Sequence, residues 1–440
     1  MKSARYKSHP ESQESEMQAI HDKGRRSRAG LALLLLAALL AQPAAAKRYP
    51  AHVFTPDVNE GEVLLVEKAT RTAYLLDIKP LPETRRAFKG LMLGENNGRK
   101  YHVGDKRTPE GIYKVTTFLP DEVLDARYGS GAFPLDYPNP IDRLKGRNGS
   151  GIWLHGRDDN DKDKQATLGC VAFANHDIRA LRQMIAPQTP VVITSKADFV
   201  DPDTYQRERE RILGVLERFL QAWEKGDFEQ LDALIDPAFR GADGLDKRRW
   251  LARKKRIFQH QRQRTIKADH IVALRENHEQ VVFDFTQSYC AANINSRGRK
   301  RLFFQKAGDS LRLISEEYRP LPPEPLPQEK VIPFVKRWLA AWNRRDLDGY
   351  VNSYAESFRD SKGRDIRAFR AFKKIIFGRR PDHRISAENL HVERLGPARF
   401  KVSFVQHYRS GELNDTGRKT LIVSGCGDRL WIEQEAWSRL

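Results

Sequence analysis

The feature that most constrains the fold is an internal repeat in the second half of the chain. A shift of 119 residues without a gap aligns two long segments. The matching residues are Ala222-Trp223 with Ala341-Trp342, Asp227 with Asp346, Phe239-Arg240 with Phe358-Arg359, Lys254-Lys255 with Lys373-Lys374, Ile257-Phe258 with Ile376-Phe377, Gln287 with Gln406, Tyr289 with Tyr408, Gly298-Arg299-Lys300 with Gly417-Arg418-Lys419, and Glu316 with Glu435. Because helical and strand-like parts both match, a whole domain is duplicated.

Each copy is predicted to begin with helices and to end with strands. The apolar residues that lie on one face of the first helix are Ile212, Leu216, Phe219, Leu220 and Trp223. The alternating segments "QVVFDFTQSYC" and "RFKVSFVQHY" predict strands later in each copy, which gives an α+β layout. We expect copies at 204–320 and 330–440, with the Pro-rich residues 321–329 as a semi-rigid linker.

The order of the repeat resembles the NTF2-like (SnoaL-like) fold. The resemblance rests on a helix with A-W-x-x-x-D, then "DPAFR" or "AESFR", then a curved terminal sheet. It implies two cone-shaped domains that bind a protein or cell-wall ligand, or that form a homodimer. Catalysis in the repeats is not expected, because His260, His270 and His278 have no counterparts in the second copy.

The N-terminal segment is typical of a secretory signal peptide. Basic residues precede an apolar run from Ala29 to Ala41, and Ala44 and Ala46 form an A-x-A cleavage site. The run is shorter than the roughly 20 residues that span a bilayer. We therefore expect a signal peptide over 1–46 and a periplasmic or cell-envelope protein, with an uncleaved anchor, or a true start at Met17, as alternatives.

The net charge of +19 predicts attraction to polyanions. Export argues against nucleic acid as the partner and leaves anionic lipid or acidic wall polymer. The basic stretch 247–264 is therefore interpreted as a solvated face. Its apolar members Trp250, Ile257 and Phe258 have apolar counterparts in the second copy, so we expect them in the core.

Residues 47–200 are expected to form a mostly β domain. Two apolar runs, Val63–Val66 and Ala73–Leu76, flank a polar turn and predict a hairpin. Further short strands are predicted in "FKGLMLG", "GIYKVTTFL", "GIWLHG" and "TPVVITS". One helix is predicted after Asp177 as its cap, with Pro187 shortly past its end.

A cysteine and a histidine in this region could act together. Cys170 follows Gly169, and His155 lies fifteen residues earlier at the end of a predicted strand. A thiol of ordinary pKa, about 8.5, is mostly protonated at neutral pH, so a nearby imidazole is the usual activating base. Gly169 permits a tight turn, and the Thr167 hydroxyl could support an oxyanion. Taken alone, the pair is also compatible with a buried cysteine and an unrelated histidine.

The other two cysteines are expected to be unpaired. Cys290 and Cys426 are not equivalent under the 119-residue shift. We therefore expect both to be small buried residues and not a disulfide.

Several motifs around Cys170 together resemble the L,D-transpeptidase (YkuD-like) catalytic domain over about residues 60–195. They are "HVGDKRTPEGIYKV", "YPNPID", "IWLHG" and "TLGCVAFANHDI", in that order. The resemblance implies Cys170 as nucleophile, His155 as general base and later acid, and the Gly156 carbonyl as the group that orients the imidazole. It also implies a peptidoglycan stem peptide as substrate, release of a terminal D-amino acid, and no cofactor.

Two positions depart from the family pattern. Leu168 stands where many members have histidine, and Ala172 stands where many have an arginine that contacts the substrate carboxylate. We expect Arg157 or Lys164 to substitute for that arginine. Family members fused to an NTF2-like domain include L,D-carboxypeptidases that set cell shape, so trimming of tetrapeptide to tripeptide is an alternative to transpeptidation. A catalytically degenerate wall-binding scaffold is the alternative from a different class.

The acidic loop before Cys170 is not expected to bind a metal. Asp159, Asp161 and Asp163 alternate like the start of a calcium loop, but Lys164 and Cys170 occupy the positions that require glycine and glutamate. The loop is interpreted as a solvated lid over the active site.

Overall fold

The computed structural model describes residues 47–57, 61–160, 165–259, 264–291, 294–380, 382–427 and 429–440. The expected signal peptide and its alternatives lie outside these ranges. No helix within them is long and apolar enough to cross a membrane.

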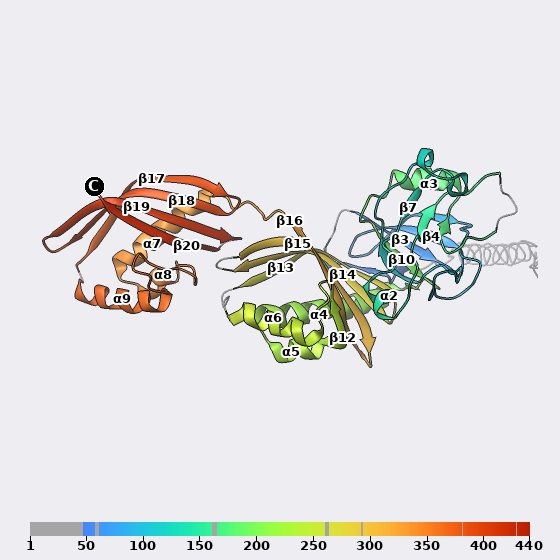
Figure 1. The fold of residues 1–440 in the computed structure, drawn as a ribbon, viewed down its shortest axis with the longest axis horizontal. Helices are drawn as coiled ribbons and strands as arrows, with labels where there is room; N and C mark the ends of the chain where they lie inside the picture. The colour runs from blue at the N-terminus through green and yellow to red at the C-terminus, as the bar shows by residue number, and fades with distance from the viewer. Residues whose placement is uncertain are drawn as a thin grey trace, which may run out of the picture. The chain divides into compact units, whose positions relative to one another are not determined.

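The first part of the chain is built on a five-stranded sheet with strand order β5-β4-β3-β10-β6 (Figure 1). The strands are β3 (Glu62–Glu67), β4 (Thr72–Asp77), β5 (Thr84–Lys89), β6 (Gly111–Lys114) and β10 (Pro190–Thr194). Strands β3 and β4 pair antiparallel, which confirms the predicted hairpin. The predicted strand in "FKGLMLG" is mostly absent, because only Met92 and Gly94 make isolated bridges beyond β5.

A second, small sheet carries the residues of interest. It has the order β7-β8-β9, with β7 (Ala132–Pro134), β8 (Trp153–His155) and β9 (Val171–Ala172). Helix α2 spans Pro140–Leu144, and the short 3₁₀ helices η1 and η2 span Asp121–Val123 and Ala126–Tyr128. Helix α3 spans Asn175–Arg182 with Ala174 at its N-cap, so the prediction that Asp177 is the cap is wrong. Asp177 lies in the first turn, where a carboxylate favours the helix dipole.

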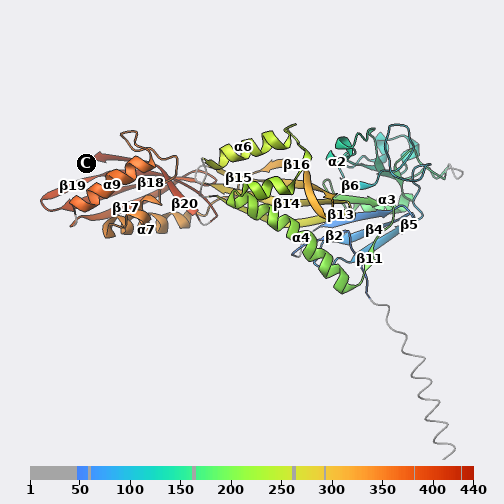
Figure 2. The same cartoon turned by 90° about the horizontal axis from the view of Figure 1, so that it is seen from below.

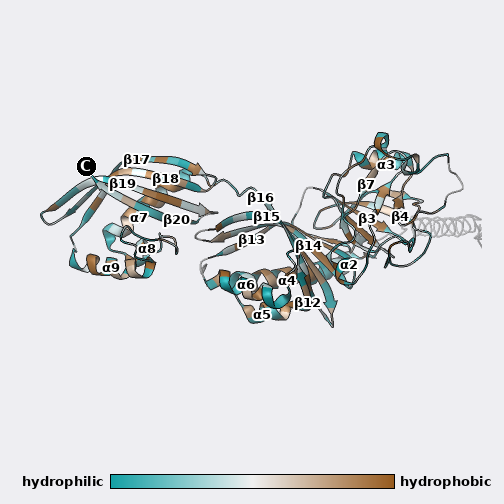
Figure 3. Ribbon diagram, in the orientation of Figure 1, coloured by the Kyte–Doolittle hydropathy of each residue, from teal (hydrophilic) through white to brown (hydrophobic). Residues whose placement is uncertain are grey.

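The first repeat places three helices on one face of a sheet (Figures 1 and 2). The helices are α4 (Pro202–Lys225), α5 (Phe228–Leu234) and α6 (Lys247–Gln259), and the strands are β12 (Ile235–Gly241), β13 (Thr265–Asn277), β14 (Gln280–Ala291), β15 (Ile294–Ala307) and β16 (Ser310–Leu321). Trp250 and Phe258 lie in the core with Ile257 packed against it, as predicted. Hydrophobic and hydrophilic residues alternate along the strands, as expected for a sheet covered on one face (Figure 3).

The second repeat has the same order of helices and then strands, but only an isolated bridge between Tyr354 and Ile432 stands in the place of β12. Its helices are η3 (Gln328–Lys330), α7 (Val331–Arg344), α8 (Leu347–Val351) and α9 (Ile366–Arg379), and its strands are β17 (Arg384–Gly396), β18 (Arg399–Ser410), β19 (Leu413–Cys426) and β20 (Arg429–Arg439). Asp227 and Asp346 cap equivalent helices. His270 and Asn389 have φ of 53° and 57° at equivalent irregularities of the first strand. The duplication therefore extends to the bends of the sheet.

Residues 49–54 lie within the range expected for the first domain, yet their second strand joins the sheet of the first repeat. Strand β1 (Tyr49–Pro50) pairs with β11 (Phe199–Val200), and β2 (Val53–Phe54) pairs with β13. His52 lies between these elements, fully buried. Its Nδ1 donates to the Arg275 carbonyl at 2.7 Å, and its Nε2 accepts from the Asp198 amide at 2.8 Å. Burial lowers the pKa of His52 to about 4, so the ring is held neutral.

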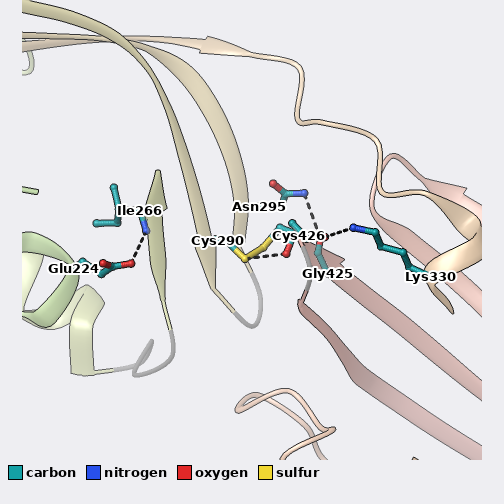
Figure 4. Close-up of a disulfide and its surroundings, with 8 residues drawn as sticks. Glu224, Ile266, Cys290, Asn295, Lys330, Gly425 and Cys426 are labelled. Atoms are coloured by element: carbon teal, nitrogen blue, oxygen red, sulfur yellow. Dashed lines mark hydrogen bonds between the residues drawn. A yellow bond between two sulfur atoms is a disulfide. The ribbon is translucent and has the colours of Figure 1, made fainter. Parts of the chain in front are cut away.

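Cys290 and Cys426, which were expected to be unpaired, are bonded to each other. Cys290 at the end of β14 and Cys426 at the end of β19 form a disulfide across 136 residues of sequence (Figure 4). The expectation that both are unpaired was wrong, because the 119-residue shift compares equivalent positions and cannot detect a bond between non-equivalent ones. The disulfide ties the two repeats together covalently.

Candidate active site

Parallel pairing of β8 with β9 brings the predicted histidine and cysteine to one place. The register sets His155 opposite Ala172, and Cys170 comes two residues before Ala172. Cys170 directly precedes β9, so the parallel pairing places it beside the strand that ends at His155. His155 and Cys170 accordingly line the same cavity of about 110 Å³.

The imidazole of His155 is fixed on two sides. Its Nδ1 is hydrogen-bonded to the carbonyl oxygen of Gly156, the group expected to orient it. The edge of the ring meets Tyr128, with centroids 5.1 Å apart. His155 is only 6% exposed, so little freedom remains for the ring to turn. With Nδ1 at the carbonyl, Nε2 is the ring nitrogen that we expect to exchange a proton with a reacting group.

The turn before Cys170 depends on Gly169 and Thr167. Gly169 has φ of +135°, and a Cβ there would meet the Arg107 carbonyl at 3.0 Å. The Thr167 hydroxyl accepts from the Gly169 amide at 3.1 Å and donates to the Cys170 carbonyl at 2.8 Å. Gly169 and Thr167 therefore shape the turn that carries Cys170, and the oxyanion contact expected of Thr167 remains a prediction. Cys170 carries a thiol outside any disulfide, with Sγ 3.4 Å from the Gly151 carbonyl.

Asn175 is a site residue that the sequence reasoning missed. Its side-chain oxygen accepts from the amides of Ser130 at 2.9 Å and Arg157 at 3.2 Å, and its nitrogen donates to the Arg157 carbonyl at 2.8 Å. A Cβ on Gly156 would approach the Asn175 oxygen to 2.2 Å. Asn175 thus holds the turn that follows His155. The only signal was its place in "GCVAFANHD", five residues after Cys170.

Of the two cations predicted to contact the substrate carboxylate, Arg157 and Lys164, only Arg157 lies in the described part of the chain. Arg157 lines the cavity, but its guanidinium donates to the carbonyls of Phe173 and Gly90. Lys164 lies outside the described residues, as do Asp161 and Asp163. A third cation, Arg127, also lines the cavity, where Asp125 holds it with two hydrogen bonds of 3.0 and 3.1 Å. Ala172, the position of the family's usual arginine, is fully buried.

Across the described ranges, no three His, Cys, Asp or Glu side chains gather closely enough to hold an ion.

Comparison with protein families gives matches in both parts of the chain. The L,D-transpeptidase catalytic domain (YkuD) matches residues 62–193. The Cds6 C-terminal NTF2-like domain matches twice, at residues 211–317 and 330–436. No curated protein matches the chain in sequence.

Solved structures that match a large part of the chain include two bacterial proteins, Bd1075 and Pgp2. Bd1075 of Bdellovibrio bacteriovorus is 25% identical, with a TM-score of 0.57 over 62% of this chain and 99% of its own. Pgp2 of Campylobacter jejuni, described as a helical cell shape determining protein, is 21% identical, with a TM-score of 0.50 over 64% of this chain and 97% of its own. Its K307A mutant is 22% identical, with the same TM-score over 64% and 96%.

These matches agree with the predicted fold class of a mostly β catalytic domain followed by two NTF2-like domains. The L,D-transpeptidase family consists of cell-wall enzymes that act on peptidoglycan peptides. The chain therefore contains an L,D-transpeptidase (YkuD) catalytic domain at residues 62–193, followed by two domains of the Cds6 C-terminal NTF2-like type.

Proposed function

We propose that this chain is an exported, cysteine-dependent L,D-transpeptidase that acts on peptidoglycan stem tetrapeptides and releases the terminal D-amino acid. The observation that carries the proposal is that His155 and Cys170 line one cavity, while Nδ1 of His155 is hydrogen-bonded to the Gly156 carbonyl. A nucleophile, a base and an orienting group in that order are the arrangement that acyl transfer requires.

The reaction runs in two halves. His155 takes the Cys170 proton, and the sulfur attacks the carbonyl carbon at the L-centre of the diamino acid. The tetrahedral intermediate collapses, the C–N bond to D-alanine breaks, and His155 returns the proton to the leaving amine. A thioester remains on Cys170. An amine of a second stem peptide then attacks it, with His155 again as base, which forms the cross-link and regenerates the thiol.

Hydrolysis of the same thioester is the second candidate, and it would make the protein an L,D-carboxypeptidase. The likeness of fold to Pgp2, a helical cell shape determining protein, adds a role in cell shape to this candidate. A degenerate wall-binding scaffold remains the proposal from another class.

Arg127 is proposed as the substrate-carboxylate contact in place of Arg157. Asp125 occupies Nε and Nη2 of Arg127, which leaves Nη1 without a hydrogen bond to another described residue. Arg127 lines the cavity and is exposed, whereas Arg157 is only partly exposed and donates from Nε and Nη2 to main-chain carbonyls. A guanidinium held by one carboxylate can present its remaining N–H groups to another.

Export to the periplasm or cell envelope is proposed from the N-terminal sequence. The Cys290–Cys426 disulfide supports it, because structural disulfides form and persist in oxidising compartments.

The proposal is tested by incubating the purified protein with a disaccharide tetrapeptide and analysing the products by mass spectrometry. Cys170→Ala and His155→Ala serve as inactive references. Cross-linked dimer or exchange of the terminal D-amino acid would establish transpeptidation, and tripeptide with free D-alanine alone would establish hydrolysis. A product that also forms with Cys170→Ala, or no product with any stem peptide, would contradict the proposal.

A further inference from the structure

The catalytic domain and the first repeat share part of one hydrophobic core. The five-stranded sheet contributes Val63, Leu65, Leu76, Ile112 and Val192, and the sheet of the first repeat contributes Val272, Leu274, Val282, Phe303 and Ile314. None of these side chains is more than 5% exposed. An interface as apolar as a domain core is typical of a permanent association. The first repeat is therefore a fixed neighbour of the catalytic domain.

A buried ion pair also joins the two. Glu276, near the end of β13, is 1% exposed, and its Oε1 accepts from Nη2 of Arg99 at 3.0 Å. Nη1 of Arg99 donates to the Glu110 carbonyl at 2.9 Å. One guanidinium thus bridges a carboxylate of the repeat and the main chain of the catalytic domain, a two-pronged contact that the planar fork of arginine favours. Removal of one partner of such a buried pair leaves the other charge uncompensated.

Glu110 ends the segment 105–110, which is the "DKRTPE" part of a motif that the reaction does not use directly. Lys68 holds the same segment from the side of β3. Its ammonium donates to the Gly98 carbonyl at 2.5 Å, to the Thr108 carbonyl at 2.9 Å and to the Glu110 carboxylate at 2.8 Å. Arg99 and Lys68 together therefore fix the place of the segment 105–110.

The segment 105–110 lies against the turn that carries Cys170. The Thr108 hydroxyl accepts from the Gly94 amide at 2.9 Å and donates to the Cys170 carbonyl at 3.4 Å. The Arg107 carbonyl would lie 3.0 Å from a Cβ on Gly169. Thr108 is fully buried, so the contact is closely packed. A displacement of this segment would accordingly displace Cys170.

We propose that Glu276 of the first repeat is a positioning residue for the reaction at Cys170. Glu276 holds Arg99, Arg99 holds the segment 105–110, and that segment holds the Cys170 turn in place relative to His155. The inference rests on the proposed function, because it concerns the rate of that reaction. The first repeat is then required for full catalysis.

The charge of Glu276 adds a pH dependence to this role. Burial raises the pKa of Glu276 to about 7, with Arg99 acting against it and Glu110 and Glu279 adding to it. Lys145 is a further charged group that acts on Glu276. The carboxyl is therefore mostly neutral at about pH 6 and mostly ionised at about pH 8. Because a hydrogen bond from a guanidinium is stronger to an ionised carboxylate, Arg99 is held more firmly at the higher pH.

The test compares kcat for D-alanine release from a stem tetrapeptide by the wild type and by Glu276→Gln. Glutamine has the shape of the neutral carboxyl, so the ratio of the two kcat values cancels the titration of His155 and Cys170, which both proteins share. A displacement of about 1 Å at a catalytic group costs about a hundredfold, so a smaller shift passed on through Arg99 predicts a kcat lower by roughly tenfold at about pH 8. At about pH 6 the two kcat values should be nearly equal, and KM should be unchanged at both.

A second readout needs no substrate. Cys170 is the cysteine outside the disulfide, so its rate of alkylation by iodoacetamide reports on the site directly. Alkylation should be slower in Glu276→Gln than in the wild type at about pH 8, and equally fast at about pH 6. If the wild type releases no D-alanine, the proposed function fails, and the alkylation rates still decide the role of Glu276.

Glu208→Gln is the matched control. Glu208 accepts from the Arg275 guanidinium at 2.7 Å, in an ion pair that lies within the first repeat, so its loss should leave kcat unchanged at both pH values. Arg99→Lys keeps the charge but not the two-pronged contact, and it gives the same comparison if Glu276→Gln folds poorly. Because Glu276 and Arg99 act through one contact, the double variant should be no slower than the slower single variant. Wild-type kcat and alkylation in Glu276→Gln, an equal loss in Glu208→Gln, a loss independent of pH, or additive losses would each overturn the proposal.

Discussion

Asn175→Ala should loosen the turn that follows His155 and thereby disturb the orientation of the His155 imidazole. The asparagine makes three hydrogen bonds, of 2.8 to 3.2 Å, with the main chain of Ser130 and Arg157. At a net value of about 0.5–1.5 kcal/mol each, their loss predicts destabilisation of the domain by roughly 1.5–4.5 kcal/mol. The Gly156 carbonyl then loses its fixed place at His155. A displacement of about 1 Å at a catalytic group can lower the rate by about a hundredfold, so kcat should fall by that order.

The matched control is Asn139→Ala in the same part of the chain. Asn139 is buried, caps α2 by accepting from the Asp142 amide at 2.9 Å, and donates to the Ile112 carbonyl at 3.1 Å. This variant should lose a similar amount of stability and keep its kcat. Chemical denaturation measures the stability, and D-alanine release at a temperature where both variants are folded measures kcat. Equal kcat in both variants, or an equal loss in both, would refute the positioning role of Asn175.

Three further predictions concern other parts of the chain. Thiol titration of the denatured protein should find one reactive thiol, Cys170, before reduction and three after it, and three before reduction would contradict the Cys290–Cys426 bond. Burial lowers the pKa of His52 to about 4 from an ordinary 6.5, so the unfolded chain takes up the proton first as the pH falls. The stability that depends on a neutral His52 is then complete above pH 6.5 and is lost between pH 6.5 and 4, by up to about 3 kcal/mol. Denaturation midpoints at pH 7 and 4.5 should therefore differ less in His52→Gln than in the wild type, and an equal difference would refute this assignment. Arg127→Met should raise KM for a tetrapeptide more than Arg157→Met does, while an unchanged KM would exclude Arg127 as the substrate contact.

The repeats could be predicted from the sequence because their signals are local and occur twice. The apolar face of α4 follows from helical spacing, and the caps at Asp227 and Asp346 follow from residue type. The 119-residue shift then extends each assignment to the other copy. The order of the motifs likewise predicted that His155 and Cys170 lie in one site. That prediction came from the family resemblance, because a spacing of fifteen residues does not by itself show that two side chains meet.

The features that were missed depend on long-range packing. Asn175 gains its role from a loop 45 residues earlier, at Ser130. The Cys290–Cys426 bond joins non-equivalent ends of two strands, so no periodicity within either repeat points to it.

The most direct test of the proposed chemistry is the intact mass of the protein shortly after mixing with a stem tetrapeptide and quenching in acid. A thioester on Cys170 predicts a mass gain equal to the tripeptide acyl group, located by peptide mapping to the segment with Cys170 and reversed by neutral hydroxylamine. Cys170→Ala should show neither the adduct nor free D-alanine. Release of D-alanine at the wild-type rate by Cys170→Ala, or an adduct that maps to another residue, would contradict a mechanism built on Cys170 and His155.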